Sequence, residues 1–454
     1  SSCIICILGG RNMGAWVSAL SAGASDMSAW VLMGLPASIY LSGMGQTWIA
    51  IGLGIGYAVS WIFMAPRLRR FSIAANDSIT IPQYLTNRFL SKNKSLQILS
   101  AIIFLVAYTI YAASSIKACG TLFNTVMDID PTVAMYIAAF IIVAYTFLGG
   151  FSAVCWTDFF QGMIMLAALL IAPLFALALA KAGDGAATGA ALPDGFFNFF
   201  TTPQDIISGL GWGLGYFGMP HIIIRFMSLK SEKELRKSSV IGISWTTIIL
   251  IMSALTAIAG RLYLGEIEDS STVFITMVRR IFPALVSGLL LSAILSAAMS
   301  TADSQLLAAS SAFASDVYKP VIRKKASDSE MLWAGRIVVI VIAIVALFIA
   351  SDPNSGSIMG LVENAWGVFG ASFGPVILLS LFWKRLTFGG TVAGIAVGAA
   401  VDILWLVFLS STDIYEIVPG FAAGLLAAVV VSLLSKGPGK DVEDLFDRAV
   451  DLKS

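Results

Sequence analysis

Long apolar stretches separated by short polar loops make up most of the chain. Several of these stretches exceed 18 residues, about the length that one helix needs to cross a bilayer. We predict twelve membrane-spanning helices, at residues 13–41, 47–65, 96–124, 131–149, 153–181, 204–227, 239–264, 283–317, 331–351, 357–383, 387–410 and 416–436. The pattern therefore predicts an all-α polytopic membrane protein that lies in a lipid bilayer.

The first apolar stretch has small and polar residues at its centre. Gly23, Asp26 and Ser28 give a helix little reason to stay regular there, and an acid at membrane depth costs about 2.5–3.5 kcal/mol on insertion scales. We predict a helix broken at this point, with the carbonyls of Ala24 and Met27 facing a cation and the freed amides facing a substrate. The alternative is that a buried Asp26 only caps a kink and binds nothing.

A second interrupted stretch lies five helices after the first. Residues 209–218 contain five glycines, and Pro220 follows them. An interior glycine costs a helix about 1 kcal/mol relative to alanine, and proline removes a backbone hydrogen bond. Two broken helices at matching places predict an inverted repeat, over residues 13–181 and 204–383, with a site near the middle of the membrane. Alternatively, the glycines only allow neighbouring helices to pack closely.

Aromatic residues recur within this second stretch. On an α-helix Trp212, Tyr216 and Pro220 step by four residues and would share one face, and His221 would fall on the other side. Two aromatic rings beside opened backbone suit a small, partly apolar organic molecule, although such a stripe also fits simple packing. We interpret His221 as a helix-end residue with a local partner.

The eighth predicted helix carries a hydroxyl-rich face. Ala297, Ser300, Thr301 and Ser304 fall at positions i, i+3, i+4 and i+7. Hydroxyl and carbonyl oxygens are hard, neutral donors that hold a monovalent cation without preventing its release. Hydrogen bonding between helices is the alternative. Asp303 points away from this face, so we do not count it as a ligand.

Other polar residues lie within predicted spans. Asp158 is expected near the cytoplasmic end of the fifth helix, where it could receive a released cation or, as a first-turn acid, interact with the helix dipole. The simplest interpretation of Arg225 is that its long side chain extends to the membrane surface and places its charge there. Glu363 and Asp402 have no spaced partner and stay unassigned.

The composition narrows the classes of function. Of the 454 residues, 58% are hydrophobic and 12% are charged, whereas soluble domains average about 25% charged. The net charge is +1 and no basic aromatic patch is present, so no nucleic-acid partner is expected. The single histidine argues against a multi-histidine metal centre. Since we find no nucleophile–base pair, we expect a protein that is not an enzyme.

The loops alternate between basic and acidic. Basic residues follow the second, sixth, eighth and tenth predicted helices, as at Arg67, Arg69 and Arg70, while the loops between them are acidic or neutral, as at Glu266 and Glu268. Basic loops stay on the cytoplasmic side of a membrane. We therefore place residues 1–12 and the C-terminal tail, residues 437–454, in the cytoplasm, and expect the tail to be mobile.

Four long motifs resemble those of bacterial sodium/proline symporters, which are members of the solute:sodium symporter family. They are LGGRNMGAWVSALSAGASDMSAWVLMGLP at residues 8–36, YTFLGGFSAVCWTDFFQ at 145–161, GWGLGYFGMPHIIIRFM at 211–227 and GLLLSAILSAAMSTADSQLL at 288–307. The resemblance extends along almost the whole chain. It implies a LeuT-type inverted-repeat transporter of five plus five core helices, with additional helices at 387–436. Such proteins usually have one more helix before the core, which is missing here or replaced by residues 1–12.

The resemblance also implies roles for individual residues. A Na⁺ site would use the backbone oxygens of Ala24, Met27 and Ala297 and the hydroxyls of Ser300 and Thr301, while Asp26 would organise that site. The substrate pocket would include Ser28, Trp30, Gly34, Tyr111, Trp212, Tyr216 and Pro220. Asp158, Arg11 and Arg225 match positions linked to ion release and gating. Asp303 stands where some proline carriers lack an acid, which leaves the ion count and the substrate open.

The resemblance implies Na⁺-coupled import of L-proline by alternating access across the inner (plasma) membrane of a bacterium. Other readings keep the fold and change the substrate to another amino acid, a sugar acid or a vitamin. A membrane nutrient sensor that does not transport and a passive channel are further alternatives. Proton coupling is disfavoured because Ser300 and Thr301 do not titrate. The sequence leaves the oligomeric state open.

Overall fold

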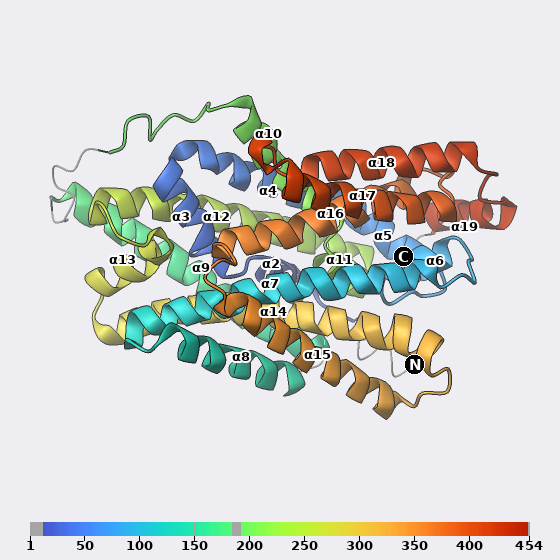
Figure 1. Ribbon diagram of the computed structural model, residues 1–454, viewed down its shortest axis with the longest axis horizontal. Coiled ribbons are helices and arrows are strands. Elements are labelled where there is room, and N and C mark those ends of the chain that lie inside the picture. The colour runs from blue at the N-terminus through green and yellow to red at the C-terminus, as the bar shows by residue number, and fades with distance from the viewer. Residues whose placement is uncertain (1–11, 149–150, 184–191, 453–454) are drawn as a thin grey trace.

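The computed structural model describes residues 12–148, 151–183 and 192–452, and this part of the chain is a bundle of helices (Figure 1). Its secondary structure is helical apart from one β-bridge between Met13 and Leu229. The described residues include nine uninterrupted helices that are long and apolar enough to cross a membrane. The other three predicted spans correspond to the shorter apolar helix α8 and to two broken helices.

The uninterrupted spans follow the predicted positions closely. Seven of them are single α-helices: α7 (Ser95–Met127), α9 (Phe151–Lys181), α12 (Glu232–Leu264), α15 (Asp328–Ser351), α16 (Ile358–Phe382), α17 (Phe388–Phe408) and α18 (Ile417–Leu434). In the eighth, α4 (Thr47–Val59) continues through a π-helical turn into α5 (Ala65–Ala74). In the ninth, α14 (Ala284–Ala312) continues into the π-helical segment η7 (Phe313–Ile322). The helix α8 spans Pro131–Leu148. The short helices α6 (Ile81–Arg88) and α13 (Val273–Ile281) lie in loops.

Both predicted breaks are present. The first helix ends at Asp26 as α2 (Ala15–Asp26), continues as one 3-10 turn, η2 (Ala29–Val31), and resumes as α3 (Gly34–Ser42). The second consists of α10 (Pro203–Gly211), the 3-10 segment η5 (Trp212–Phe217) and α11 (Pro220–Ser228). Pro220 begins α11, where its missing N–H is not needed. Each break falls where the sequence has small residues, proline or both.

The glycines of the second stretch allow close packing in addition to the break, so the alternative that they only allow packing is wrong. A Cβ on Gly52 of α4 would lie 2.2 Å from the carbonyl oxygen of Gly209, and one on Gly56 would lie 2.2 Å from that of Gly213. No side chain fits at such distances. The backbone of α4 therefore lies directly against α10 and η5, and this contact holds the second broken helix in position.

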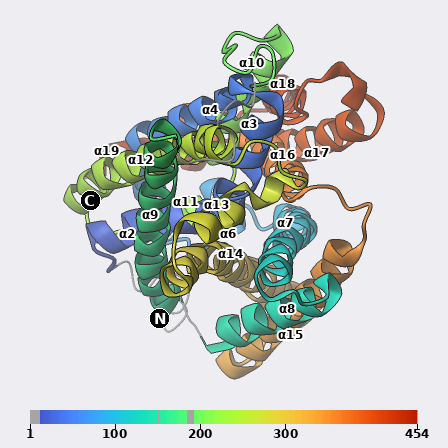
Figure 2. The ribbon, with the colours of Figure 1, turned by 90° about the vertical axis from the view of Figure 1, so that its left-hand side faces the viewer.

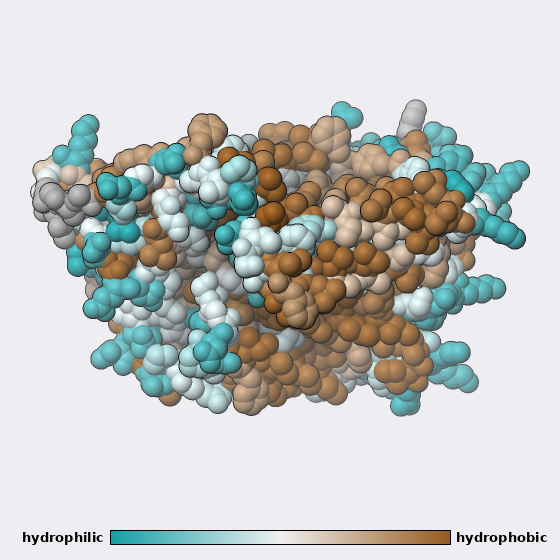
Figure 3. Space-filling model, turned by 45° about the horizontal axis from the view of Figure 1, so that its top comes forward, coloured by the Kyte–Doolittle hydropathy of each residue, from teal (hydrophilic) through white to brown (hydrophobic). Residues whose placement is uncertain are grey.

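The segments α2 and α11 of the broken helices are buried in the bundle, whereas α10 lies at its edge. The helix α2 packs against α9, α12, α14 and α11. Figure 2 shows the bundle from one end, with α11 in its interior and α2 next to α9. The pair α17 and α18 packs on α16 at the periphery. On the face drawn in Figure 3, apolar side chains cover the middle of the molecule and hydrophilic ones gather at its two ends, as a membrane requires.

The prediction of a mobile C-terminal tail is wrong for residues 440–451. They form α19 (Lys440–Asp451), which packs on α5. Its buried residues are Val442, Leu445, Phe446 and Ala449, a spacing typical of an amphipathic helix. The Phe446 ring lies edge-on to Phe71 at 5.1 Å, and Arg88 donates to the Val442 carbonyl at 3.2 Å. The charge of this segment had hidden its apolar stripe.

The glycine contact can be tested with two neighbouring alanine substitutions. We expect Gly56→Ala to destabilise the protein by about 1–3 kcal/mol, because the new methyl group must separate α4 from η5. Gly54→Ala is the matched control, since its Cβ would only meet Leu250 Cδ1 at 3.8 Å. Thermal unfolding in detergent measures both. An equal melting temperature for the two variants would show that the close approach is unimportant.

Candidate ion and substrate site

The break in α2 frees the carbonyl of Ala24, and α14 supplies hydroxyls to it. The amide of Ser28 would bond to Ala24 in a continuous helix, but it donates to the Asp26 carbonyl instead, at 2.9 Å. The Ser300 hydroxyl donates to the Ala24 carbonyl at 2.8 Å, and the Thr301 hydroxyl lies 3.4 Å from the same oxygen. These three residues, taken from distant parts of the chain, are fully buried.

Of the other predicted ion ligands, Ala297 lies beside this contact and Met27 follows the last residue of α2. The Ser300 hydroxyl is also 3.2 Å from the Ala297 carbonyl. Met27 is fully buried, and its amide donates to Gly23 at 2.8 Å. Carbonyl and hydroxyl oxygens on two helices provide the hard, uncharged donors that suit Na⁺. Among the described residues, no group of three or more His, Cys, Asp or Glu side chains is placed to hold a metal ion.

Asp26 joins the two broken helices. Its carboxylate accepts a hydrogen bond from the Tyr216 hydroxyl of η5 at 2.5 Å. Its backbone carbonyl accepts from the Trp30 indole at 3.2 Å and from the Tyr111 hydroxyl at 3.4 Å. Within the described part of the chain, its second carboxylate oxygen has no hydrogen-bond partner. Asp26 therefore does more than cap a kink, because it brings three predicted substrate residues around the break.

The remaining predicted substrate residues line the broken segments. The Ser28 hydroxyl accepts from the Trp30 amide at 3.4 Å and so begins η2. Gly34 opens α3, where a Cβ would come within 3.3 Å of Met359 and of Trp30. Pro220 starts α11. Their roles in substrate binding remain a prediction.

The prediction that Trp212 and Tyr216 share one face is wrong. Residues 212–217 form a 3-10 helix, which has three residues per turn, so a step of four turns the side chain by about 120°. Tyr216 reaches Asp26, whereas the Trp212 ring lies 5.0 Å from Tyr415. Trp366 lies between them: it donates to the Trp212 carbonyl at 2.8 Å, and its ring lies 5.0 Å from Tyr216. Trp212 and Tyr216 thus contact different partners, and their roles in substrate binding stay a prediction.

His221 does not have the local partner that we predicted. Its Nε2–H donates to the Ser25 carbonyl at 3.2 Å, and its Nδ1 lies 3.3 Å from the Tyr108 hydroxyl. The same hydroxyl accepts from the His221 amide at 3.1 Å and is free to donate to Nδ1. A neutral imidazole with the proton on Nε2 satisfies all of these contacts. His221 therefore fixes the Ser25 carbonyl at the end of α2.

Arg225 is also placed differently from the prediction. It is fully buried, and its guanidinium forms an ion pair with Asp158 at 3.2 Å. The same group donates to Ser304 at 2.6 Å and to Ser21 at 3.1 Å. Its charge therefore does not reach the membrane surface. A buried pair of this kind is stable only with further hydrogen bonds, which these two serines supply.

Asp158 is not a first-turn acid. The helix α9 begins at Phe151, so Asp158 lies about two turns into it, and its side chain points into the bundle. Its carboxylate also accepts from the Ser21 hydroxyl at 2.7 Å. The helix-dipole alternative is therefore wrong.

Two further residues of the sequence analysis are placed as follows. Asp303 is buried one residue before Ser304, and Arg11 lies outside the described residues.

The sequence analysis did not identify the contacts that residues far apart in the sequence make around the two broken helices. Trp366 and Tyr415 flank Trp212, and His221 reaches α2 across 196 positions of sequence. None of these side chains stands in a motif with the residue that it contacts. The one available signal was that His221 is a polar residue within an apolar span. A buried polar side chain of this kind needs a hydrogen-bond partner, which can come from a distant part of the chain.

Comparison with curated proteins finds relatives along almost the entire chain. The high-affinity proline transporter PutP of Bacillus subtilis (strain 168) is 45% identical over 455 residues, which cover 99% of this chain and 96% of that protein. A sodium/proline symporter of Haemophilus influenzae is also 45% identical, over 98% of this chain and 92% of its own.

Solved structures with the same fold are more distant in sequence. A substrate-bound, outward-open Na⁺-coupled sialic acid symporter has a TM-score of 0.77 at 21% identity, covering 96% of this chain and 93% of that one. MhsT in complex with L-phenylalanine has a TM-score of 0.58 at 14% identity, covering 93% and 98%. These likenesses confirm the predicted LeuT-type fold. The limits of the two repeats, at residues 13–181 and 204–383, remain a prediction.

The model of the sodium:solute symporter family matches residues 6–398, which include both broken helices and α14. This match and the identity to the two curated relatives agree over the same part of the chain. The chain belongs to the sodium:solute symporter family.

Proposed function

We propose that this protein imports L-proline together with Na⁺ across the inner membrane of a bacterium. The observation that carries the proposal is the contact of the Ser300 and Thr301 hydroxyls with the Ala24 carbonyl at the break of α2. The relatives named as proline transporters support the choice of substrate. The arginines of α5 lie at the same end of the bundle as α19, which supports a cytoplasmic C-terminus.

Sodium would enter between α2 and α14. Its ligands would be the carbonyl oxygens of Ala24, Met27 and Ala297 and the hydroxyls of Ser300 and Thr301. In exchanging hydrogen bonds for bonds to the ion, these groups would tie the broken helix to α14. Their oxygens are uncharged at every physiological pH, which favours Na⁺ over a proton.

Proline would bind next to the ion as a zwitterion. Its carboxylate would face amides released by the broken helices, where the dipoles of half-helices favour an anion. Its ring would contact Trp30, Tyr111 and Tyr216, the aromatic residues that the structure gathers around Asp26. Trp212 would act by supporting Trp366 behind Tyr216.

Ion and substrate are coupled through α2. Sodium would fix one side of its break through Ala24, and proline would use the aromatic residues held by Asp26 on the other side. By thermodynamic linkage, Na⁺ must raise the affinity for proline as much as proline raises the affinity for Na⁺. The Asp158–Arg225 pair, from α9 and α11, bonds to Ser21 of α2 and Ser304 of α14 and would control how the ion leaves.

The available energy is sufficient for uphill transport. One Na⁺ moving down a potential of about 100 mV releases about 2.3 kcal/mol, and a tenfold gradient adds about 1.4 kcal/mol. At one ion per substrate this supports a roughly few-hundred-fold accumulation of proline.

The function can be tested with purified protein in liposomes. We expect labelled proline to accumulate when Na⁺ is high outside, and not when K⁺ replaces Na⁺ on both sides. Adding a Na⁺ ionophore should abolish the accumulation. Uptake that is insensitive to Na⁺ would contradict symport, whereas Na⁺-driven uptake of another solute with none of proline would contradict only the substrate.

The ion site predicts an effect of Thr301→Ala on sodium dependence. We expect the Na⁺ concentration for half-maximal uptake to rise about fivefold, because one oxygen ligand worth about 1 kcal/mol is lost. Ser310→Ala is the control, since Ser310 lies on the same helix and, among the residues that the structure describes, its hydroxyl bonds only to the Leu307 carbonyl. An identical sodium dependence in both variants would remove Thr301 from the site.

The link between the broken helices predicts an effect of Tyr216→Phe. Loss of the hydroxyl that bonds to Asp26 should raise the KM for proline roughly tenfold, because the ring is no longer fixed at the break. Tyr136→Phe, on the exposed face of α8, serves as the control. If the KM of the Tyr216 variant equals that of the unmodified protein, the aromatic residues do not depend on Asp26.

A further inference from the structure

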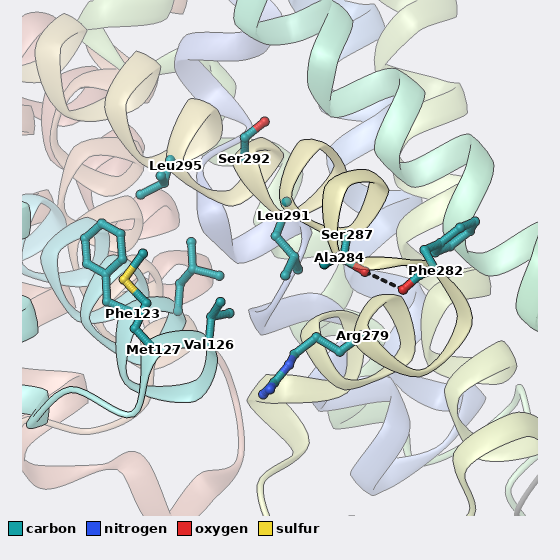
Figure 4. A pocket seen from close by; sticks show the side chains of 12 residues that line it. Phe123, Val126, Met127, Arg279, Phe282, Ala284, Ser287, Leu291, Ser292 and Leu295 are labelled. Atoms are coloured by element: carbon teal, nitrogen blue, oxygen red, sulfur yellow. Dashed lines mark hydrogen bonds between the residues drawn. The ribbon is translucent and has the colours of Figure 1, made fainter.

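A groove on the outside of the bundle lies between α7, α13 and α14, at the end opposite α19 (Figures 1 and 4). Its volume is about 480 Å³, within the range of about 300–1,000 Å³ that is typical of ligand pockets. Apolar side chains dominate its lining, among them Phe123, Met127, Leu291 and Leu295. Among the described residues that line it, only Arg279 is charged.

The groove is separate from the proposed ion and substrate site. Its α14 residues, Ala284, Gly288, Leu291 and Leu295, step by three or four positions and so share one side of that helix. Ser300 follows Leu291 by nine positions, which is about two and a half turns, and therefore faces the opposite side. A molecule in the groove would touch α14 from behind the ion site.

The surroundings of the groove face the acyl chains of the membrane. Met127 at the end of α7 is 61% exposed, and Leu285 and Leu289 of α14 are 79% and 64% exposed. Side chains of this kind are stable at a surface only when lipid covers it. The space next to them is therefore open to lipid.

Arg279 supplies a positive charge at the mouth of the groove. Figure 4 shows its side chain reaching from α13 toward Val126 and Met127. It donates one hydrogen bond, to the Thr125 carbonyl at 2.6 Å, out of five that a guanidinium can donate. Within the described ranges, no carboxylate lies within 4.0 Å of it. Its position suits a phosphate group.

We propose that this groove binds one phospholipid, with an acyl chain between α7 and α14 and an anionic headgroup on Arg279. The charge, the apolar lining and the lipid-facing surroundings match the two halves of such a molecule. The lipid would support the outer parts of α13 and α14 and, through α14, the helix that carries Ser300 and Thr301. This site does not depend on the proposed transport function.

The proposal is tested by measuring lipid retained on the full-length protein. Protein in detergent is incubated with phosphatidylglycerol or phosphatidylethanolamine of identical chains, and bound lipid is counted by native mass spectrometry. We expect phosphatidylglycerol to be retained preferentially. Arg279→Gln should lower its retention about fivefold, the effect of about 1 kcal/mol for one basic residue near a membrane surface.

Two further variants make the result specific. Arg280→Gln removes the neighbouring charge, which does not line the groove, and should leave retention unchanged. Gly288→Leu puts an apolar side chain into the groove from a position where a Cβ would meet no atom within 4 Å, and should lower retention of both lipids.

Three results would overturn the proposal. The first is equal retention of the two lipids by the unmodified protein. The second is an equal loss in the Arg279 and Arg280 variants, which would mean attraction by general surface charge. The third is a loss in the Arg279 variant alone with none in Gly288→Leu, which would mean that Arg279 binds a free anion and the groove binds no chain.

Discussion

The structure depends on one backbone carbonyl that has no hydrogen-bond partner within its own helix. A regular α2 would use the Ala24 oxygen for its own hydrogen bond, but the helix stops at Asp26 and leaves this oxygen to the hydroxyls of Ser300 and Thr301. An unsatisfied carbonyl at membrane depth costs several kcal/mol, so the partner has to be present. The Ala24 carbonyl can exchange its hydrogen bonds to these hydroxyls for a bond to a cation. It could not do so if it were bonded to an amide within a regular helix.

The second broken helix completes the arrangement. It contributes Tyr216 to the Asp26 carboxylate and His221 to the Ser25 carbonyl, so two buried groups at the end of α2 have partners on another broken helix. The glycine contact with α4 holds this helix close enough to do so. Ion and substrate would thus act on the same few backbone groups, which gives a physical basis for coupling them.

Much of the fold could be predicted from the sequence, and so could part of the site. Hydropathy located the spans, and glycine and proline located the breaks, because both effects are local. The face shared by Ala297, Ser300 and Thr301 follows from helical spacing. The partners of Arg225 and His221 could not be predicted, since they depend on how distant helices pack. The face of Trp212 was predicted wrongly because residues 212–217 form a 3-10 helix and not the expected α-helix. The helix α19 was not predicted because its charged residues outnumber the apolar residues of its buried stripe.

The most direct test of this account is hydrogen–deuterium exchange at the break of α2, measured over residues 24–31 with and without Na⁺. If sodium ties Ala24 to α14, its addition should slow exchange of these amides in the unmodified protein and have little effect in a variant that lacks the Thr301 hydroxyl. Exchange at the break that is the same with and without Na⁺ would contradict the central claim.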